Sequence, residues 1–408
     1  MKCRHCRSSI TTSLLDLGSS PPSNSYLTAE TLHRPELWFP LRVLVCEQCW
    51  LVQTEDFAEA EKLFDSEYAY FSGFSSTWLE HCERYVDDVI KRFELDENSL
   101  VAEVATNDGS LLRFVLDKGI PCIGIEPTES TAEAARQKGV PIIQEFFGVP
   151  LADELAKDGK AVDLVAANNV LAHVPDINDF VAAFPRILKP NGVATFEFPH
   201  LLRLIRETQF DTIYHEHFSY LSLTAVSKIF SANGLEIFDV EEIPTHGGSL
   251  RIFAQRSDSG RHVVSAQVAA LAVREQNEGV AQPKYYSGFQ SRAEAVKDEV
   301  LKFLLAAKAE GKTVCGYGAA AKGNTLLNYA GIKTDLVSFV VDRNPAKQGK
   351  FLPGSRIPIA GEERLRHERP DYVLLLPWNL KSELIEQLDY IREWNGKFVT
   401  AIPQLTVK

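Results

Sequence analysis

The chain has 408 residues, of which 45% are hydrophobic and 24% are charged, and its formal net charge is −12 at pH 7. This length predicts two or three domains that fold without disulfide staples. The acidic balance argues against nucleic acid and anionic membrane surfaces as partners. No apolar run reaches the ~18 residues that span a bilayer, and residues 1–6 lack the apolar stretch of a signal peptide, so we expect a cytoplasmic protein.

Two C-x-x-C pairs stand near the N-terminus, Cys3 with Cys6 and Cys46 with Cys49. Two thiolates three positions apart hold one side of a tetrahedral ion, and a second pair closes the other side. A pair of redox motifs is the alternative, but two such pairs in a short segment favour structural Zn²⁺ with no open coordination position. Residues 1–60 are therefore predicted to form a zinc-binding domain, which is too small to rely on its own core.

The next region, residues 61–255, alternates predicted helices and strands. Strand–helix alternation at this spacing implies a parallel, doubly wound sheet. Helices are predicted over 77–93, 110–118 and 130–138, and strands over 100–105, 122–126, 163–167, 192–197, 235–240 and 250–254.

Residues 256–408 are predicted to form a second α/β domain with a connecting helix. A polar helix over 285–310 leads into a strand–turn–helix unit at 313–324, and further strands are predicted over 337–342 and 372–376. Repeated strand–helix units of this kind again indicate an α/β fold.

A candidate cofactor site lies where the first strands of the central region end, as is typical of nucleotide sites in open α/β sheets. The G-x-G-x-x-G fingerprint is missing, which weakens a nicotinamide interpretation, while an acidic residue ends the second strand, where it can accept both ribose hydroxyls. A cofactor with a ribose but no pyrophosphate, such as S-adenosylmethionine, fits best. The alternative is a generic α/β fold whose acidic strand ends are merely solvated. The candidate cofactor ligands are Glu103, Asn107, Asp108, Gly109, Glu126 and Asn168.

The densest cluster of acid–base residues is 214–220, Tyr-His-Glu-His-Phe-Ser-Tyr. Imidazoles, a carboxylate and phenols this close together can abstract a proton and stabilise an oxyanion. The H-x-H spacing also favours a metal, although the H-E-x-x-H pattern of zinc peptidases is missing. The structural alternative places the aromatic rings in the core and the histidines at the surface. His173 lies near the same sheet edge, although a lone histidine among apolar neighbours is more often structural.

Two glycine-containing turns are candidate substrate sites. At 316–324, small residues and Lys322 stand at a helix start, where N–H groups and the helix dipole favour phosphate. The order is not that of a Walker loop, so the segment favours binding of a nucleotide diphosphate without hydrolysis. An ordinary tight turn with a solvated lysine is the alternative. At 245–251, the glycines either allow a ligand close to the backbone or simply permit positive φ.

In this order, the cysteine pairs, the 103–109 loop, the 214–218 cluster, His246-Gly247-Gly248 and 316–322 resemble the motifs of sugar C-methyltransferases. The resemblance covers essentially the whole chain. It implies an N-terminal zinc-binding domain, a central Rossmann-like domain that binds S-adenosylmethionine, and a C-terminal Rossmann-like α/β domain that binds a sugar nucleotide. The implied substrate is a nucleotide-linked 4-keto-6-deoxysugar, with dTDP favoured. It would be methylated at the carbon beside the ketone, commonly C-3, in branched-chain deoxysugar biosynthesis.

The resemblance also implies roles for individual residues. His217 is the expected base, Tyr214 and Glu216 occupy functional positions of the same motif, and His173 and Tyr68 match a further active-site histidine and tyrosine. A proton alpha to a ketone is acidic enough for an imidazole if donors stabilise the enolate, and Tyr214 and His173 are both candidates for that donor. The expected substrate ligands are Tyr70, His246, Gly247, Tyr317, Lys322 and Asn324.

One departure from the family pattern lies in the cofactor loop, where Ala105 and Thr106 replace the usual glycine. The change is tolerable because the cofactor lacks the pyrophosphate that demands close backbone approach. Two other functions remain open from the sequence: an O- or N-methyltransferase on the same scaffold, and a zinc-containing binding protein without turnover. The sequence leaves the oligomeric state undetermined.

Overall fold

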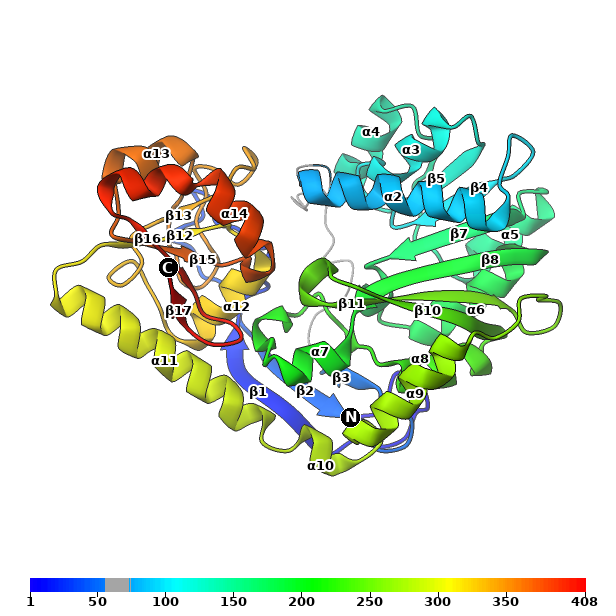
Figure 1. Ribbon diagram of the computed structural model, residues 1–408, viewed down its shortest axis with the longest axis horizontal. Helices are drawn as coiled ribbons and strands as arrows, with labels where there is room; N and C mark the ends of the chain where they lie inside the picture. Colours follow the sequence, from blue (N-terminus) through cyan, green and yellow to red (C-terminus); the bar gives the residue numbers. More distant parts are fainter. Residues whose placement is uncertain (56–72, 74) are drawn as a thin grey trace.

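The computed structural model describes residues 1–55, 73 and 75–408, and within them the chain forms three β-sheets (Figure 1). The predicted α/β fold class is confirmed by this mixture of sheets and covering helices. Tyr68 and Tyr70 lie outside the described residues. None of the helices in the described part of the chain has the length and apolar character of a membrane-spanning segment.

The N-terminal sheet is antiparallel, and one of its strands comes from the middle of the chain. Val52 pairs with Tyr220, so the sheet that begins in the cysteine-rich segment ends in the acid–base cluster. The order is β1-β2-β3-β9, with β1 (Thr12–Ser20), β2 (Phe39–Val45), β3 (Val52–Thr54) and β9 (Ser219–Tyr220).

The central sheet has seven strands in the order β10-β11-β8-β7-β4-β5-β6. The strands from β8 to β6 are parallel, while β11 runs antiparallel to both β8 and β10. Residues 164–167 are fully buried, as expected for a parallel strand covered on both faces. The strands are β4 (Val101–Val104), β5 (Cys122–Ile125), β6 (Ile142–Ile143), β7 (Val162–Asn168), β8 (Leu188–Pro199), β10 (Leu235–Ile243) and β11 (Ser249–Arg256).

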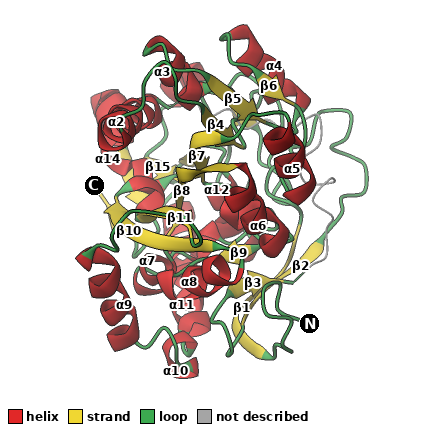
Figure 2. Ribbon diagram, turned by 90° about the vertical axis from the view of Figure 1, so that its right-hand side faces the viewer, coloured by secondary structure: helices red, strands yellow, loops and turns green. Residues whose placement is uncertain are grey.

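Helices cover both faces of the central sheet. Figure 2 shows α2 and α3 on one side and α5 and α6 on the other. Helix α2 has a Ser75 N-cap whose side chain accepts from the Trp78 N–H, which satisfies one free donor of the first turn. The helices of this region are α2 (Ser76–Phe93), α3 (Ser110–Asp117), α4 (Glu129–Gln137), α5 (Val149–Lys157), α6 (Ile177–Ile187), α7 (Leu201–Arg206) and α8 (Leu223–Ala232).

The C-terminal sheet has six strands in the order β14-β13-β12-β15-β16-β17, of which only β17 is antiparallel to its neighbour. The predicted strand at 337–342 shrinks to two residues. The elements are β12 (Val314–Tyr317), β13 (Val340–Val341), β14 (Ile359–Ala360), β15 (Tyr372–Leu375), β16 (Lys397–Thr400), β17 (Thr406–Val407), α12 (Ala321–Tyr329), α13 (Glu362–Glu368) and α14 (Lys381–Gln387).

The connection between the two larger sheets consists of three helices, α9 (Ala266–Glu278), α10 (Pro283–Tyr286) and α11 (Phe289–Ala309). The single helix predicted over 285–310 is therefore wrong at its start. Gly288 adopts φ 78, a left-handed conformation that interrupts the helix before α11 begins.

The N-terminal sheet packs against both larger units (Figure 1). Leu15 and Leu41 share one hydrophobic cluster with Phe289 and Leu327, whereas the metal-binding cysteines belong to the cluster of the central sheet. A segment this short cannot bury enough apolar surface alone, so it is stabilised by both neighbours. Five short 3₁₀ segments complete the elements used below, η2 (Leu171–His173), η3 (Phe210–Thr212), η4 (Thr245–Gly247), η5 (Trp378–Leu380) and η6 (Asp389–Trp394).

Candidate active site

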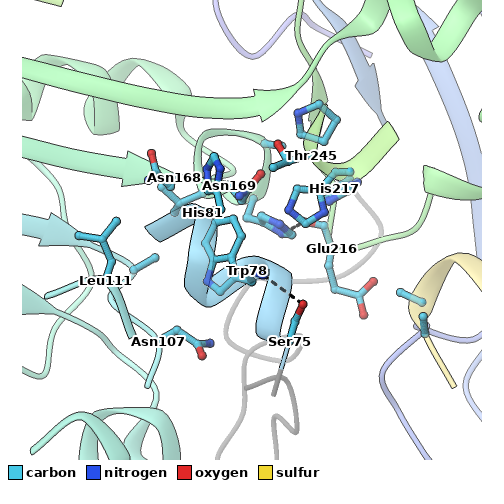
Figure 3. A pocket seen from close by; sticks show the side chains of 18 of the residues that line it. Ser75, Trp78, His81, Asn107, Leu111, Asn168, Asn169, Glu216, His217 and Thr245 are labelled. Carbon is cyan, nitrogen blue, oxygen red and sulfur yellow. Dashed lines mark hydrogen bonds between the residues drawn. The ribbon is translucent and has the colours of Figure 1, made fainter. Parts of the chain in front are cut away.

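A cavity of about 1350 Å³ is lined by side chains of both the central and the C-terminal units (Figure 3). The central sheet contributes the ends of β4, β5 and β7, at Ala105, Glu126 and Asn168. The C-terminal sheet contributes the ends of β12 and β13, at Tyr317 and Asp342. Open α/β sheets bind ligands at such edges, and here two of them share one cavity.

The loop after β4 keeps the backbone shape expected of a glycine-rich turn. Ala105, Asn107 and Gly109 all have positive φ, at 57°, 55° and 74°. Ala105 therefore adopts the left-handed conformation that glycine favours, although it has a side chain. The Glu126 carboxylate supports this loop, because its Oε2 accepts from the Asn107 N–H at 2.8 Å and its Oε1 accepts from the Thr128 N–H at 3.0 Å.

Buried polar atoms without partners mark the place of a ligand beside this loop. Glu103 Oε2 and both amide atoms of Asn168 make no hydrogen bond in the described part of the chain, and both residues line the cavity. Burial raises the pKa of Glu103 well above its usual value, and the nearby carboxylates of Asp108 and Glu126 add to the rise. Such groups need partners. The amino group and ribose hydroxyls of S-adenosylmethionine would donate to the Glu103 and Asn168 oxygens, and an oxygen of the cofactor would accept from Asn168 Nδ2, so the residues fit this cofactor.

Two of the predicted cofactor ligands are not among the described residues that line the cavity, Asp108 and Gly109. Asp108 accepts from the Ser110 hydroxyl at 2.6 Å and pairs with Lys138 at 2.9 Å, which ties the start of α3 to the end of α4. A Cβ on Gly109 would lie 3.0 Å from the Cβ of Ala135. Both residues therefore set helix packing around the loop.

His217 is held in one tautomer by its neighbours. Its Nδ1 lies 2.8 Å from the carbonyl oxygen of Thr212, which can only accept, so Nδ1 carries the proton. Its Nε2 is then the acceptor, and the Tyr214 hydroxyl donates to it at 2.8 Å. Burial lowers the pKa of His217 well below its usual value, so the ring is neutral near pH 7. A neutral imidazole with a basic nitrogen at the cavity has the form of a general base.

His173 lies against the same ring, with centroids 4.6 Å apart. Its Nδ1 donates to the carbonyl oxygen of Glu216 at 2.8 Å, so its Nε2 is also an acceptor. Burial lowers the pKa of His173 to about 4, and the ring is neutral. A neutral His173 in this tautomer cannot donate from Nε2 to a ketone.

The Glu216 carboxylate points away from the His217 ring (Figure 3) and is held by the N-terminal segment. Its Oε1 accepts from the backbone and side-chain nitrogens of Asn24 at 3.2 and 3.1 Å, while Oε2 is buried without a hydrogen bond to the described residues. Burial raises its pKa. His215, the other histidine of the cluster, turns its Nε2 toward the carbonyl oxygens of Phe39 and Pro40 instead.

A buried network of hydrogen bonds and ion pairs that the sequence did not predict contributes His81, Glu241 and Arg251 to the lining of the cavity. His81 Nε2 lies 2.8 Å from Glu197 Oε2, and Arg251 donates to Glu197 Oε1 at 2.7 Å and to Glu241 at 3.0 Å. Burial opposes ionisation of Glu197, but the His81 hydrogen bond and the Arg251 charge lower its pKa. His81 and Glu197 stand 116 positions apart and Glu197 and Arg251 stand 54 apart, so no local pattern indicates the network. Trp78 lies against His81, with ring centroids 5.2 Å apart.

Of the predicted substrate ligands in the described part of the chain, His246, Tyr317 and Lys322 line the cavity. Gly247 and Asn324 do not. A Cβ on Gly247 would approach the Trp378 ring to 2.5 Å, and the Asn324 amide donates to the Ser23 carbonyl oxygen at 2.6 Å. These two residues therefore join the C-terminal unit to its neighbours, Gly247 through close approach and Asn324 through a buried hydrogen bond.

The C-terminal edge of the cavity repeats the loop support seen at the central edge. Asp342 Oδ2 accepts from the Ala319 N–H at 2.7 Å, and its Oδ1 accepts from the Asn344 N–H at 2.8 Å. Here positive side chains are close by. Lys347 Nζ donates to the Ala319 carbonyl oxygen at 2.9 Å and lies 3.8 Å from Asp342, and Arg343 lines the cavity at an exposed position.

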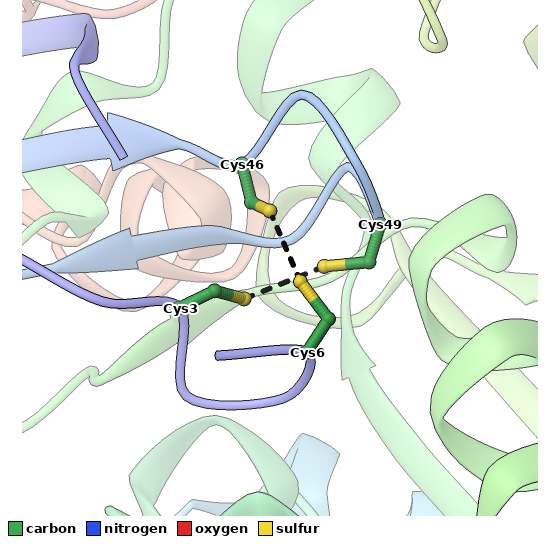
Figure 4. Close-up of side chains that lie close together, drawn as sticks. All are labelled: Cys3, Cys6, Cys46 and Cys49. Atoms are coloured by element: carbon green, nitrogen blue, oxygen red, sulfur yellow. Dashed lines mark hydrogen bonds between the residues drawn. The ribbon is translucent and has the colours of Figure 1, made fainter. Parts of the chain in front are cut away.

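The four N-terminal cysteines meet at one point (Figure 4). Their Sγ atoms all lie within 4.8 Å of one another, with Cys3 and Cys49 3.4 Å apart and Cys6 and Cys46 also 3.4 Å apart. All four are free thiols. Four sulfur ligands from two C-x-x-C turns fit tetrahedral Zn²⁺ with no open position, which makes a structural role the fitting one.

Three family models match the chain: a zinc binding domain over residues 3–64, a methyltransferase domain over 78–240, and a C-methyltransferase C-terminal domain over 244–403. The chain is also 34% identical over 403 residues to the C-methyltransferase NovU of Streptomyces niveus, a match that covers 99% of this chain and 96% of the relative. The chain belongs to the C-methyltransferase family. It is an S-adenosylmethionine-dependent enzyme with an N-terminal zinc-binding domain, as the resemblance implied.

Other matches are partial. A ubiquinone biosynthesis O-methyltransferase of Rhizobium etli is 25% identical over 163 residues, which is 35% of this chain and 62% of the relative. The magnesium protoporphyrin IX methyltransferase of Synechocystis, solved with bound SAM, matches 50% of this chain and 100% of its own, at 17% identity and a TM-score of 0.36. Neither extends over the whole chain as the C-methyltransferase does.

Proposed function

We propose that this C-methyltransferase acts in the cytoplasm on a nucleotide-linked 4-keto-6-deoxysugar, with dTDP as the favoured nucleotide, and methylates C-3. The observation that carries the proposal is the locked tautomer of His217, whose basic Nε2 lies in a cavity shared by the cofactor edge and a second, basic edge. A carbon acid beside a ketone is the kind of substrate that a neutral imidazole can deprotonate. The division into residues 1–60, 61–255 and 256–408 stays a prediction.

His217 takes the proton from C-3 in this proposal. The Thr212 carbonyl holds the ring by its Nδ1–H, and it also stabilises the imidazolium that forms when Nε2 gains a proton. The Tyr214 hydroxyl must leave Nε2 for the substrate to reach it, which frees its proton for the sugar. The hydrogen bond from Asn24 to the Glu216 side chain holds Glu216 in place. Because the carbonyl oxygen of Glu216 accepts from His173 Nδ1, His173 keeps its orientation beside His217.

Bound S-adenosylmethionine supplies the electrophilic methyl group for the carbon nucleophile. The chain's contribution is to orient the reactants and to keep the carbanion away from water. Glu126, Asn107, Glu103 and Asn168 are the residues that would hold the cofactor, through acceptors at the ends of β4, β5 and β7. A zinc ion held by the four cysteines would have no open coordination position, so it would take no part in the chemistry.

The basic edge supports a nucleotide diphosphate on the substrate. Arg343 and Lys347 both line the cavity at the C-terminal edge, where the first turn of α12 also begins. Positive side chains and free N–H groups at a helix start favour phosphate oxygens. A cavity of about 1350 Å³ is large enough for a cofactor and a sugar nucleotide together, because single ligand sites occupy roughly 300–1,000 Å³.

Mass spectrometry of a panel of nucleotide 4-keto-6-deoxysugars, incubated with enzyme and S-adenosylmethionine, tests this function. A gain of about 14 mass units, one CH₂, on a panel member is expected, and NMR then locates the new methyl carbon. Deuterium wash-in at C-3 in heavy water is expected on the same compound, because only C-methylation requires loss of a carbon-bound proton. A methylated product whose new group lies on oxygen or nitrogen would contradict the proposal.

A further inference from the structure

Lys322 brings a positive charge to the part of the cavity that the histidines line. It stands in the first turn of α12, and its Nζ donates to Asn379 Oδ1 at 3.0 Å and approaches the carbonyl oxygen of His246 at 3.5 Å. The same nitrogen lies 4.9 Å from the centre of the Trp378 ring. Groups from the central and the C-terminal units therefore hold one ammonium in place.

The buried Asp211, on η3, is bonded to the same Trp378 whose ring Lys322 contacts. Its Oδ2 accepts from the Trp378 indole N–H at 2.7 Å, and its Oδ1 has no hydrogen-bond partner in the described part of the chain. Asp211 is 1% exposed and is not among the described residues that line the cavity. Burial lowers the pKa of Lys322 to about 8, and the Asp211 charge opposes that fall.

Among the described residues, the histidines, the tryptophan and the asparagine that face Lys322 carry no charge near pH 7. His217 follows η3 and His246 lies on η4, and burial lowers the pKa of His217 well below its usual value and that of His246 to about 4. The Lys322 charge lowers both further. Trp378 and Asn379, on η5, are neutral. Burial raises the pKa of Asp211 to about 7, against the lowering effect of the Lys322 charge, so the carboxyl is fully ionised only above neutral pH. The ammonium and this carboxylate are then the charges that the described residues place in this ring of neutral groups.

Both imidazole N–H groups beside the base are already engaged, and the Tyr214 hydroxyl, which must leave His217 when the substrate binds, is a neutral donor. Nδ1 of His173 donates to the Glu216 carbonyl oxygen, Nδ1 of His217 donates to the Thr212 carbonyl oxygen, and the Tyr214 hydroxyl donates to His217. An oxygen that gains negative charge here gains most from a positive group that is already fixed in place.

We propose that Lys322 is a further catalytic residue, whose ammonium stabilises the enolate oxygen, and that Asp211 is the positioning residue that holds it. This inference rests on the proposed function. When the C-3–H bond breaks, the proton goes to His217 Nε2, and its electron pair forms the C–C double bond of the enolate. The former carbonyl oxygen takes the negative charge and accepts from Lys322 Nζ. In the next step the pair returns to C-3 and bonds the methyl carbon, as the S–CH₃ bond breaks toward sulfur.

A role in binding phosphate is the competing assignment for Lys322, and the two roles separate experimentally. The assay is deuterium wash-in at C-3 in heavy water, with enzyme, keto-sugar nucleotide and no methyl donor, so that only enolisation is measured. Lys322→Met is expected to slow wash-in at saturating substrate by about a hundred-fold, the usual loss for one oxyanion donor. Its dissociation constant for the substrate should change by no more than about three-fold, since a ground-state contact is not what is lost.

Lys347→Met provides the matched contrast, because Lys347 lines the same cavity beside Asp342. It is expected to give the opposite split, a weaker substrate affinity with a smaller loss of the saturated rate. If Lys322→Met instead weakens substrate binding and keeps the saturated wash-in rate, Lys322 is a phosphate ligand and the proposal is wrong. It is equally wrong if Lys322→Met keeps wash-in while Thr245→Val abolishes it, since the buried Thr245 hydroxyl is a neutral donor in the same cavity.

Asp211→Asn tests the positioning role and retains an acceptor for Trp378. Loss of the negative charge should move the alkaline fall of the wash-in rate down by about one pH unit, because Lys322 then loses its proton more easily. A variant that only destabilised the fold would lower the wash-in rate without changing the pH at which the rate falls on the alkaline side. If the pH of this alkaline fall is the same in Asp211→Asn as in the unaltered enzyme, the positioning role of Asp211 is contradicted.

The double variant Lys322→Met/Asp211→Asn guards against misfolding, because it leaves no unpaired buried charge. It should be as slow as Lys322→Met, whereas recovery of the rate would show that the lysine only neutralised Asp211 and would overturn the proposal. Absence of wash-in by the unaltered enzyme with every keto-sugar would instead refute the proposed function, and this inference with it.

Discussion

The two edges of the cavity are built by the same device and differ in charge. In each, the loop after one strand donates a backbone N–H to a carboxylate that follows the neighbouring strand, Asn107 to Glu126 at 2.8 Å and Ala319 to Asp342 at 2.7 Å. In each, the second carboxylate oxygen accepts from the N–H two residues further on. The support of the loop is therefore independent of what the edge binds.

The surroundings of the two carboxylates set the difference. Beside Glu126 lies the buried Glu103, whose Oε2 has no partner among the described residues, whereas Lys347 lies 3.8 Å from Asp342. An edge rich in acceptors suits a ligand with a sulfonium and an amino group, and an edge rich in cations suits a diphosphate. The neutral imidazoles lie between the two edges. There, neither the carboxylates of one edge nor the cations of the other prevent proton transfer from carbon.

The largest expected effect lies between the edges. His217→Ala should lower methyl transfer by about a thousand-fold, the scale of a lost general base, with both ligands still bound. Single-turnover kinetics and calorimetric titration of each ligand separate the two effects. If the variant lost cofactor affinity together with turnover, His217 would also support the edge at Glu126, and the separate roles of this edge and the histidines would be contradicted.

The pH profile of the wash-in reaction tests whether His217 is neutral at physiological pH. Burial lowers the pKa of His217 well below its usual value, so the base stays unprotonated and the rate should hold from pH 7.5 down to about 6. The rate should fall only below that, as Nε2 gains a proton. A midpoint at the ordinary histidine value of about 6.5 would show that the ring titrates as if exposed.

Loss of the metal should damage both edges together. Cys46→Ser removes one of four ligands, and we expect lower zinc content and a free energy of unfolding reduced by several kcal/mol, since metal binding and folding are coupled. Elemental analysis and thermal unfolding measure these, and the lost activity should follow the lost fold. Full zinc occupancy in this variant would remove Cys46 from the ligand set.

Glu126→Ala should affect ligand binding only at the edge formed by Glu126 and Glu103. Removing a charged acceptor costs about 1.5–3 kcal/mol, which corresponds to roughly ten- to a hundred-fold weaker binding of S-adenosylmethionine. Substrate affinity, measured without cofactor, is the control. An equal loss for both ligands would show that the two edges do not act independently.

The smallest expected effect is at the exposed rim. Arg343→Ala should weaken substrate binding only about two- to five-fold, because exposed charges contribute roughly 0.2–1 kcal/mol and are screened by salt. The difference between the unaltered enzyme and the variant should shrink as ionic strength rises. A salt-independent difference would place Arg343 in a buried contact with the substrate.

The sequence alone predicts the elements and motifs well, because each depends on neighbours along the chain. Strand periodicity, the C-x-x-C pairs and the acid–base cluster are local patterns. The partners that fix the site are not, since Asp211 and Trp378 stand 167 positions apart, and Arg251 and His81 stand 170 apart. Asp108, Gly109, Gly247 and Asn324 are not among the described residues that line the cavity, and their contacts with distant parts of the chain follow from the packing and not from a local pattern.

The pairing of β3 with β9 has a consequence for attempts to recombine this enzyme with its relatives. Arg4, between two of the cysteines, donates to the carbonyl oxygens of Thr54 and Phe218, and the Thr54 hydroxyl donates to that of His217. The segment that carries His217 is thus attached to the cysteine-rich unit, although a linear division of the chain assigns it to the central region. A chimera that exchanges residues 1–60 should exchange residues 212–221 with them, because the two segments share one sheet and the hydrogen bonds of Arg4 and Thr54.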